Sequence, residues 1–141
     1  MRLAHIYLNF PGSCEEAFKF YERVFGTKIE GILRYGEADF ADPVPETAKS
    51  KIMNIHMPIT EQVHLMGADS VEGYGPPLVV GNNFNVCLVA DTKEEADRVF
   101  ACLGDGGRVT MPLENAPWGP YFGMCTDKFD IQWMVSLEGP A

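Results

Sequence analysis

The stretch SCEEAFKFYERVFG at residues 13–26 shares its design with TKEEADRVFACLGD at residues 92–105. Each begins with Ser or Thr and has Glu three residues later, the capping-box pattern that satisfies free backbone N–H groups at a helix start. In both stretches apolar residues recur every three or four positions, which predicts an amphipathic helix with glycine at its C-terminal end. The first stretch lies early in one half of the chain and the second early in the other half. A unit repeated in this way indicates an internal duplication.

Short apolar segments flank both predicted helices and are expected to form strands. In the first half they are residues 3–10, 27–33, 51–57 and 62–66, and in the second half residues 84–90, 108–111, 121–125 and 131–137. Each half therefore has the order strand, helix, three strands. This order predicts an α+β fold of two tandem βαβββ modules. Because a helix covers only one face of its sheet, the open faces are expected to form a curved mixed sheet with a cleft.

The chain of 141 residues is expected to form a single domain, since one core readily reaches this size. Module one is placed at about residues 1–67 and module two at about residues 83–141. The segment at about residues 68–82 is rich in Gly and Pro and is predicted to be the linker. Residues 35–50, which are acidic and contain two prolines, are predicted to form a surface loop that can fold over a site.

The charge balance and the absence of special segments exclude several classes of protein. With 11 Lys and Arg against 20 Asp and Glu, the net charge is −9, which disfavours nucleic acid as a partner. No apolar run approaches the roughly 18–20 residues of a membrane span, and the N-terminal residues do not resemble a signal peptide. The four cysteines form no C-x-x-C pair, so reduced thiols in a cytoplasmic protein are expected.

Two groups of short motifs lie near the ends of the chain. The first is YLNFPG at residues 7–12 with CEEA at residues 14–17, and the second is WG at 118–119, TDKF at 126–129 and WM at 133–134. In order and spacing these motifs resemble the PhnB-like branch of the vicinal-oxygen-chelate superfamily, which includes glyoxalase I, bleomycin-resistance proteins and extradiol dioxygenases. The resemblance implies a homodimer with a small-molecule cleft in each subunit.

The resemblance also implies where a divalent metal ion would bind. Superfamily members take one ligand from the first strand and one from the last strand of each module, typically His, Glu or Gln, which suit Zn, Ni, Mn or Fe. In module one these positions are assigned to His5 and His64, which are the candidate metal ligands. In module two they are assigned to Asn85 and Met134, both poor ligands, so the four-ligand site is predicted to be incomplete. Glu61 or a carboxylate of residues 35–50 is a further candidate.

Five residues are predicted to contact a small organic ligand, because amide, imidazole, thioether and aromatic groups suit the wall of such a site. They are His56, Asn85, Trp118, Tyr121 and Met134. For most Met and aromatic side chains the alternative is packing in the core. The alternative for His5 is a hydrogen-bonded strand residue, and for His64 a polar cleft residue that orients a ligand without metal. His56 is interpreted as a residue of either the cleft or the surface. No catalytic residue is assigned, since Cys125 has no neighbouring base in the sequence.

Two hypotheses about function remain open from the sequence. The first is a protein that binds or sequesters a small molecule without metal, for which the acidic surface suits a cationic ligand. The second is a metal-dependent lyase, isomerase or dioxygenase-type enzyme whose cation polarises two adjacent oxygens of its substrate as a Lewis acid. Asn85 and Met134 at expected ligand positions favour the first hypothesis.

Overall fold

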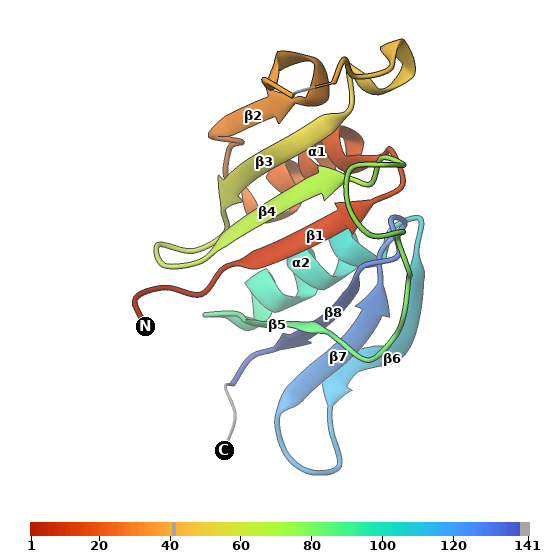
Figure 1. Ribbon diagram of the computed structural model, residues 1–141. Helices are drawn as coiled ribbons and strands as arrows, with labels where there is room; N and C mark the ends of the chain where they lie inside the picture. Colours follow the sequence, from red (N-terminus) through yellow and green to blue (C-terminus); the bar gives the residue numbers. More distant parts are fainter. Residues whose placement is uncertain (41, 139–141) are drawn as a thin grey trace. The chain divides into compact units, whose positions relative to one another are not determined.

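The computed structural model describes residues 1–40 and 42–138, and in them the order strand, helix, three strands occurs twice (Figure 1). The chain divides into two compact units, Met1–Val79 and Val80–Ala141. Each unit has one four-stranded mixed sheet and one long helix. The predicted α+β class with two βαβββ modules is confirmed. The end of predicted module two, residues 139–141, lies outside the described residues.

Unit one contains sheet A, in which the strand order is β1-β4-β3-β2. Its elements are β1 (Ile6–Phe10), α1 (Cys14–Phe25), β2 (Gly31–Arg34), β3 (Ile52–Pro58) and β4 (His64–Asp69). Strand β1 runs parallel to β4, and the other neighbours are antiparallel. The predicted loop after β2 contains two short 3-10 helices, Tyr35–Glu37 and Glu46–Ala48. Strand β4 continues to Asp69, so the start of the predicted linker belongs to the sheet.

Unit two repeats this arrangement in sheet B, with the strand order β5-β8-β7-β6. Its elements are β5 (Val86–Val89), α2 (Lys93–Gly104), β6 (Arg108–Asn115), β7 (Tyr121–Thr126) and β8 (Gln132–Ser136). Helix α2 has the same length as α1, 12 residues, and begins directly after Thr92 as α1 begins directly after Ser13. The repeat predicted from the two helix sequences is therefore present in the structure. No described helix has the length and apolar character needed to cross a membrane.

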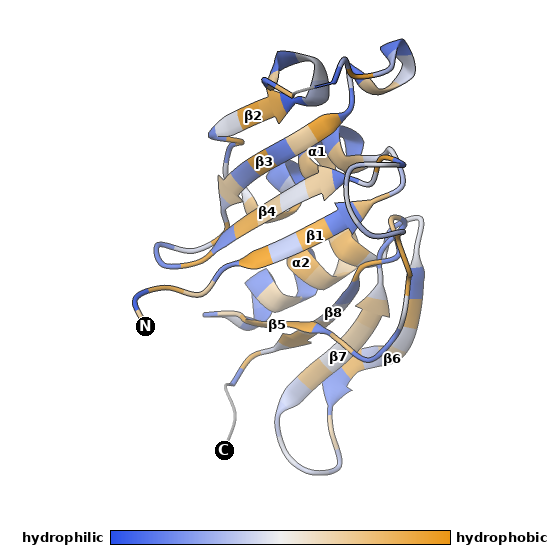
Figure 2. Ribbon diagram, viewed as in Figure 1, coloured by the Kyte–Doolittle hydropathy of each residue, from blue (hydrophilic) through white to orange (hydrophobic). Residues whose placement is uncertain are grey.

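One helix covers one face of sheet A and leaves the other face open. Leu8 and Phe10 of β1 are buried with α1, whereas Tyr7 and Asn9 between them are exposed. This alternation follows from the two-residue period of a strand, and Figure 2 shows it as alternating hydropathy along β1. The face of sheet A that carries Tyr7 and Asn9 is called the open face below.

The two helices begin differently although their sequences match. In α2 the Thr92 hydroxyl accepts a hydrogen bond from the Glu95 N–H at 3.1 Å, as the capping box predicts. The Glu95 carboxylate accepts from the N–H of Asp91 at 3.0 Å, one residue earlier than the pattern specifies. The predicted cap of α1 is wrong, because within the described part of the chain the Ser13 side chain makes no capping hydrogen bond. The N–H of Cys14 donates instead to the Asp69 carboxylate at 2.9 Å.

Asp69 joins three elements of unit one from a buried position. Its carboxylate oxygens accept hydrogen bonds from the N–H groups of Cys14 and Ile52, each at 2.9 Å. Its backbone carbonyl accepts from the Tyr35 hydroxyl at 3.0 Å. The side chain at the end of β4 thus holds the start of α1 and the start of β3, with only 3% of Asp69 exposed. Such charge-assisted bonds are roughly twice as strong as neutral ones.

Replacing Asp69 by Asn tests this junction, because the amide has the same shape but only one acceptor oxygen. One of the two backbone N–H groups then meets an NH₂ group in a buried place, so we expect Asp69→Asn to lower the free energy of unfolding by about 2–3 kcal/mol. Urea unfolding followed by circular dichroism measures the change. The exposed Glu72→Gln exchange is the matched control and should change stability by less than about 0.5 kcal/mol. Equal stabilities for the two variants would contradict this role of Asp69.

Candidate functional site

All three histidines of the chain gather at one end of the open face. The ring centroids of His5 and His64 are 5.2 Å apart, and those of His56 and His64 are 5.7 Å apart. The N–H of His64 donates a hydrogen bond to Nδ1 of His5 at 3.1 Å. The structure therefore brings together the two predicted metal ligands and also His56, which the sequence assigned to ligand contact.

Glu30 completes a group that the sequence did not indicate. Three side chains, those of Glu30, His56 and His64, each offer one ligating atom. These three atoms lie within 4.8 Å of one another. The N–H of Glu30 donates to the carbonyl of His56 at 2.9 Å, which continues the antiparallel pairing of β2 with β3. Among residues 1–40 and 42–138, neither Glu61 nor the acidic loop supplies a member of this group. Antiparallel pairing of the predicted strands 27–33 and 51–57 would have placed Glu30 near His56, and this is the signal in the sequence that could have identified it.

Gly31 makes room for the His56 ring. The two residues are paired between β2 and β3, and a Cβ atom at Gly31 would lie 2.6 Å from His56 Nε2. Any side chain at Gly31 would thus force the imidazole to rotate away. The present position of the ring depends on this glycine.

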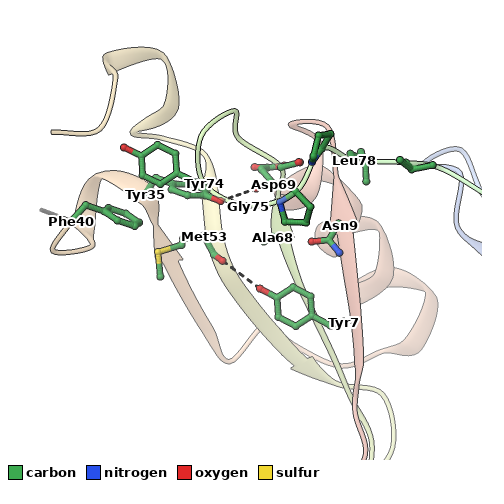
Figure 3. Close-up of a pocket in the computed structure, with 14 residues that line it drawn as sticks. Tyr7, Asn9, Tyr35, Phe40, Met53, Ala68, Asp69, Tyr74, Gly75 and Leu78 are labelled. Carbon is green, nitrogen blue, oxygen red and sulfur yellow. Dashed lines mark hydrogen bonds between the residues drawn. The ribbon is translucent and has the colours of Figure 1, made fainter. Parts of the chain in front are cut away.

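A pocket of about 640 Å³ lies toward the other end of the open face (Figure 3). One wall consists of three aromatic rings in contact, whose centroids are 6.0 Å apart for Tyr35 and Phe40, 5.6 Å for Tyr35 and Tyr74, and 4.9 Å for Phe40 and Tyr74. These rings come from the two irregular segments on either side of β3 and β4. Figure 3 shows Tyr7 and Asn9 of β1 across the pocket from them.

The pocket offers neutral polar groups. The Tyr7 hydroxyl donates to the Met53 carbonyl at 3.4 Å, and Asn9 is exposed beside it. Burial raises the pKa of the Tyr7 and Tyr35 hydroxyls, so both remain protonated donors near neutral pH. The Asp69 carboxylate also borders the pocket, but its oxygens already accept two backbone N–H groups. Binding here would therefore depend on aromatic contact and on neutral hydrogen bonds.

None of the five residues predicted to contact a ligand is among the described residues that line this pocket. His56 lies in the histidine cluster on the same face of sheet A. The lining residues escaped sequence reasoning because Tyr35, Phe40 and Tyr74 come from irregular segments. The sequence did offer one signal for this pocket, the prediction that residues 35–50 fold over a site. Tyr35 and Phe40 lie within that segment.

The strand register corrects one equivalence between the two units. Ile6 pairs with Leu65 in sheet A, and Val86 pairs with Trp133 in sheet B. The residue that corresponds to His64 is thus Gln132, whose side chain donates from Nε2 to the Phe84 carbonyl at 2.7 Å. The sequence placed Met134 at the His64 position, which is wrong, because spacing alone could not fix the parallel pairing.

Met134 lies in a row of sulfur-containing side chains across sheet B. Strand pairing places Cys87 beside Met134, Met134 beside Met124, and Met124 beside Met111. Side chains paired in this way share one face of the sheet. Thioethers are flexible and polarisable, so this row forms an adaptable apolar surface.

The other predicted ligand contacts of unit two lie in different surroundings. Trp118 is 63% exposed in the turn after β6 and contacts the edge of Phe122, with ring centroids 5.9 Å apart. Tyr121 lies against α2, where its hydroxyl donates to the Asp97 carboxylate and the Lys93 ammonium is 5.2 Å from its ring. Asn85 is half-buried just before β5.

The ligand set implied by family resemblance does not fit a divalent cation well in this chain. This set consists of His5, His64, Asn85 and Met134, and its last two members are a neutral carboxamide and a thioether, which are poor ligands for such a cation. Moreover, Nδ1 of His5 already accepts a hydrogen bond, so the proton of the neutral ring is on Nε2. His5 in this arrangement has no lone pair left for a metal ion.

Comparisons with known proteins agree with the architecture. The family model of the Glyoxalase/Bleomycin resistance protein/Dioxygenase superfamily matches residues 2–135. Protein YjdN of Escherichia coli (strain K12) is 28% identical over 141 residues, covering 93% of this chain and 92% of YjdN. Protein PA1353 from Pseudomonas aeruginosa has a TM-score of 0.81 and 36% identity, covering 95% of this chain and 96% of that one. A PhnB protein from Bacillus cereus has a TM-score of 0.75 and 27% identity, covering 96% and 98%.

The four cysteines differ in exposure, so the reactivity of their thiols tests the burial of each side chain. All are free thiols; Cys87 is exposed, Cys102 is half-buried, and Cys14 and Cys125 are buried. Burial, followed by the Asp127 carboxylate, raises the pKa of the Cys125 thiol to about 11, so it stays protonated at pH 8.

With Ellman's reagent at pH 8 we expect one fast thiol, Cys87, and a slower one, Cys102. The two buried thiols should react only after unfolding. Cys87→Ser should remove the fast phase and leave the others. A fast phase that persists in a Cys87→Ser/Cys102→Ser double variant would contradict the burial of Cys14 and Cys125.

Proposed function

Because the chain belongs to the glyoxalase/bleomycin resistance protein/dioxygenase superfamily, with PhnB-like structural neighbours, we propose that it binds a small organic molecule on the open face of sheet A. The observation that carries this proposal is the pocket beside Tyr7 and Asn9. Its volume of about 640 Å³ lies in the range of small-molecule sites. Three aromatic rings on one side and neutral donors on the other are the combination that such sites use.

The lining favours a ligand with an aromatic or alkyl part and a polar group that can accept a hydrogen bond. The Tyr35, Phe40 and Tyr74 rings supply the apolar contact, and Asn9 lies across from them. A polyanion is disfavoured by the net charge of −9. A cationic aromatic ligand would gain from the acidic loop and from cation–π contact with the rings.

A pocket variant with a matched control tests this proposal. The neutral aromatic probe N-phenyl-1-naphthylamine, which fluoresces in apolar surroundings, should bind with one saturable site per chain. Tyr74→Ala removes one aromatic contact and should weaken binding about fivefold to tenfold, the equivalent of about 1–1.4 kcal/mol. Tyr121→Ala removes a tyrosine that lies against α2 and should leave the affinity unchanged.

An equal loss of affinity in both tyrosine variants would contradict the pocket as the site. An unchanged affinity in Tyr74→Ala would do the same. Circular dichroism of both variants without probe shows whether either substitution has disturbed the fold.

We further propose that the protein is a cytoplasmic homodimer, as superfamily resemblance implies. Exposed apolar side chains support the dimer, since contact with a second copy would remove their apolar area from water. Val79, Phe84, Val89, Val109 and Trp118 are each at least half exposed. The four free thiols support the cytoplasm, where cysteines stay reduced.

Light scattering coupled to size exclusion tests the dimer. It should give a mass near twice the 15.6 kDa of one chain. A mass near 15.6 kDa at micromolar concentration would contradict it.

A second candidate function is a metal-dependent lyase or isomerase that acts on a substrate with adjacent oxygens. The group formed by Glu30, His56 and His64 favours it, because a carboxylate and two imidazoles this close together could hold a Lewis-acid cation. This candidate requires the metal site argued below. Protein that binds no divalent metal would rule it out while leaving the ligand pocket untouched.

A further inference from the structure

We propose that Glu30, His56 and His64 bind one divalent transition-metal ion, such as Zn²⁺, entirely within unit one. Two imidazoles and one carboxylate form a ligand set that suits Zn²⁺ and related ions and leaves coordination positions open. This set differs from the one that the family resemblance implies, which takes its ligands from the first and last strands of both modules. The proposal is independent of the pocket described above.

The distances fit an ion after small side-chain rotations. The three ligating atoms lie within 4.8 Å of one another. Atoms bound to one tetrahedral Zn²⁺ at about 2.0–2.2 Å are roughly 3.4 Å apart. The remaining gap of at most about an ångström and a half can be closed by side-chain torsions of the three residues, of which Glu30 is exposed and long enough to adjust most easily.

The backbone beneath the ligands is fixed by the sheet. The N–H of Glu30 is bonded to the carbonyl of His56, and β3 is paired with β4 from Ile55 to Pro58. His64 faces Pro58 in that register, so His56 and His64 lie diagonally on one face of the sheet. Their rings are nearly parallel, at 22°, with centroids 5.7 Å apart. Ligands held by neighbouring strands lose little freedom when a metal binds.

His5 contacts the cluster but acts as a positioning residue in this proposal. Its Nδ1 accepts the N–H of His64 at 3.1 Å and so holds the main chain of a metal ligand. The neutral ring keeps its proton on Nε2, which therefore has no lone pair to offer. Removing such an outer contact typically lowers metal affinity tenfold to a hundredfold.

Metal titration of the untagged full chain tests the proposal. Zn²⁺ is titrated against a chromophoric chelator, and Co²⁺ is followed by its visible absorption. We expect one ion per chain. Glu30→Gln, His56→Ala and His64→Ala should each weaken binding by more than about a hundredfold, since each removes a ligand. Glu61→Gln, an exposed glutamate outside the cluster, is the matched control and should bind as the unaltered chain does.

Two further variants distinguish this ligand set from one that contains His5. His5→Asn keeps an acceptor near the Nδ1 position and should retain most of the affinity, whereas His5→Ala should lose about tenfold or more. Gly31→Ala keeps every ligand but displaces the His56 ring, so it should weaken Zn²⁺ binding and alter the Co²⁺ spectrum.

Two results would overturn the proposal. One is the absence of stoichiometric binding by the unaltered chain. The other is binding that survives Glu30→Gln but is abolished by His5→Asn, which would assign the metal to His5. Thermal unfolding of the metal-free variants checks that each still folds. If a ligand variant does not fold, the loss of Zn²⁺ affinity expected in Gly31→Ala is the test of the site in its place, and unchanged affinity in Gly31→Ala would contradict the proposal.

Discussion

Each sheet of this protein has a single helix, and that constraint governs the rest of the structure. In unit one, α1 buries Leu8 and Phe10 of β1, so Tyr7 and Asn9 must face the other way. Alternate side chains of a strand point to opposite faces of the sheet, so burying one set on α1 places the other set on the opposite face. A four-stranded sheet thus always presents an uncovered row of side chains, and the chemistry of that row decides what the unit can bind.

The two units place different chemistry on the same backbone. Sheet A carries imidazole, phenol and amide groups, whereas sheet B carries the sulfur row from Cys87 to Met111. The sulfur row is apolar and adaptable, so it cannot hold a cation in the way that imidazole and carboxylate groups can. The metal site and the aromatic pocket proposed for this chain therefore both belong to unit one.

The units also differ in the length of one connection. In unit one, α1 ends at Phe25 and β3 begins at Ile52, whereas in unit two α2 ends at Gly104 and β7 begins at Tyr121. The connection in unit one is the longer of the two. Its additional chain falls in the segment that supplies Tyr35 and Phe40 to the pocket, which explains why unit one has these rings.

Local patterns in the sequence were sufficient for the helices and the repeat, because caps and apolar periodicity act within a few residues. These local patterns did not predict features that depend on contacts between residues far apart in the sequence. Ser13 makes no capping hydrogen bond, and the first N–H of α1, that of Cys14, is bound by the Asp69 carboxylate from 55 residues away. Glu30 was missed for the same reason, because only the pairing of β2 with β3 brings it to His56. The register of two parallel strands likewise placed Gln132 where Met134 was expected, and spacing along the chain does not contain that information.

The open face of sheet A is the proposed binding surface, and its histidine end is the proposed metal site. Anomalous diffraction at the zinc edge from crystals of the Zn²⁺-loaded protein tests this most directly. We expect one peak at about 2.0–2.2 Å from a Glu30 oxygen and from one nitrogen each of His56 and His64, with His5 still hydrogen-bonded to the His64 backbone. A peak bound to Nε2 of His5 instead, or no peak at this cluster, would contradict it.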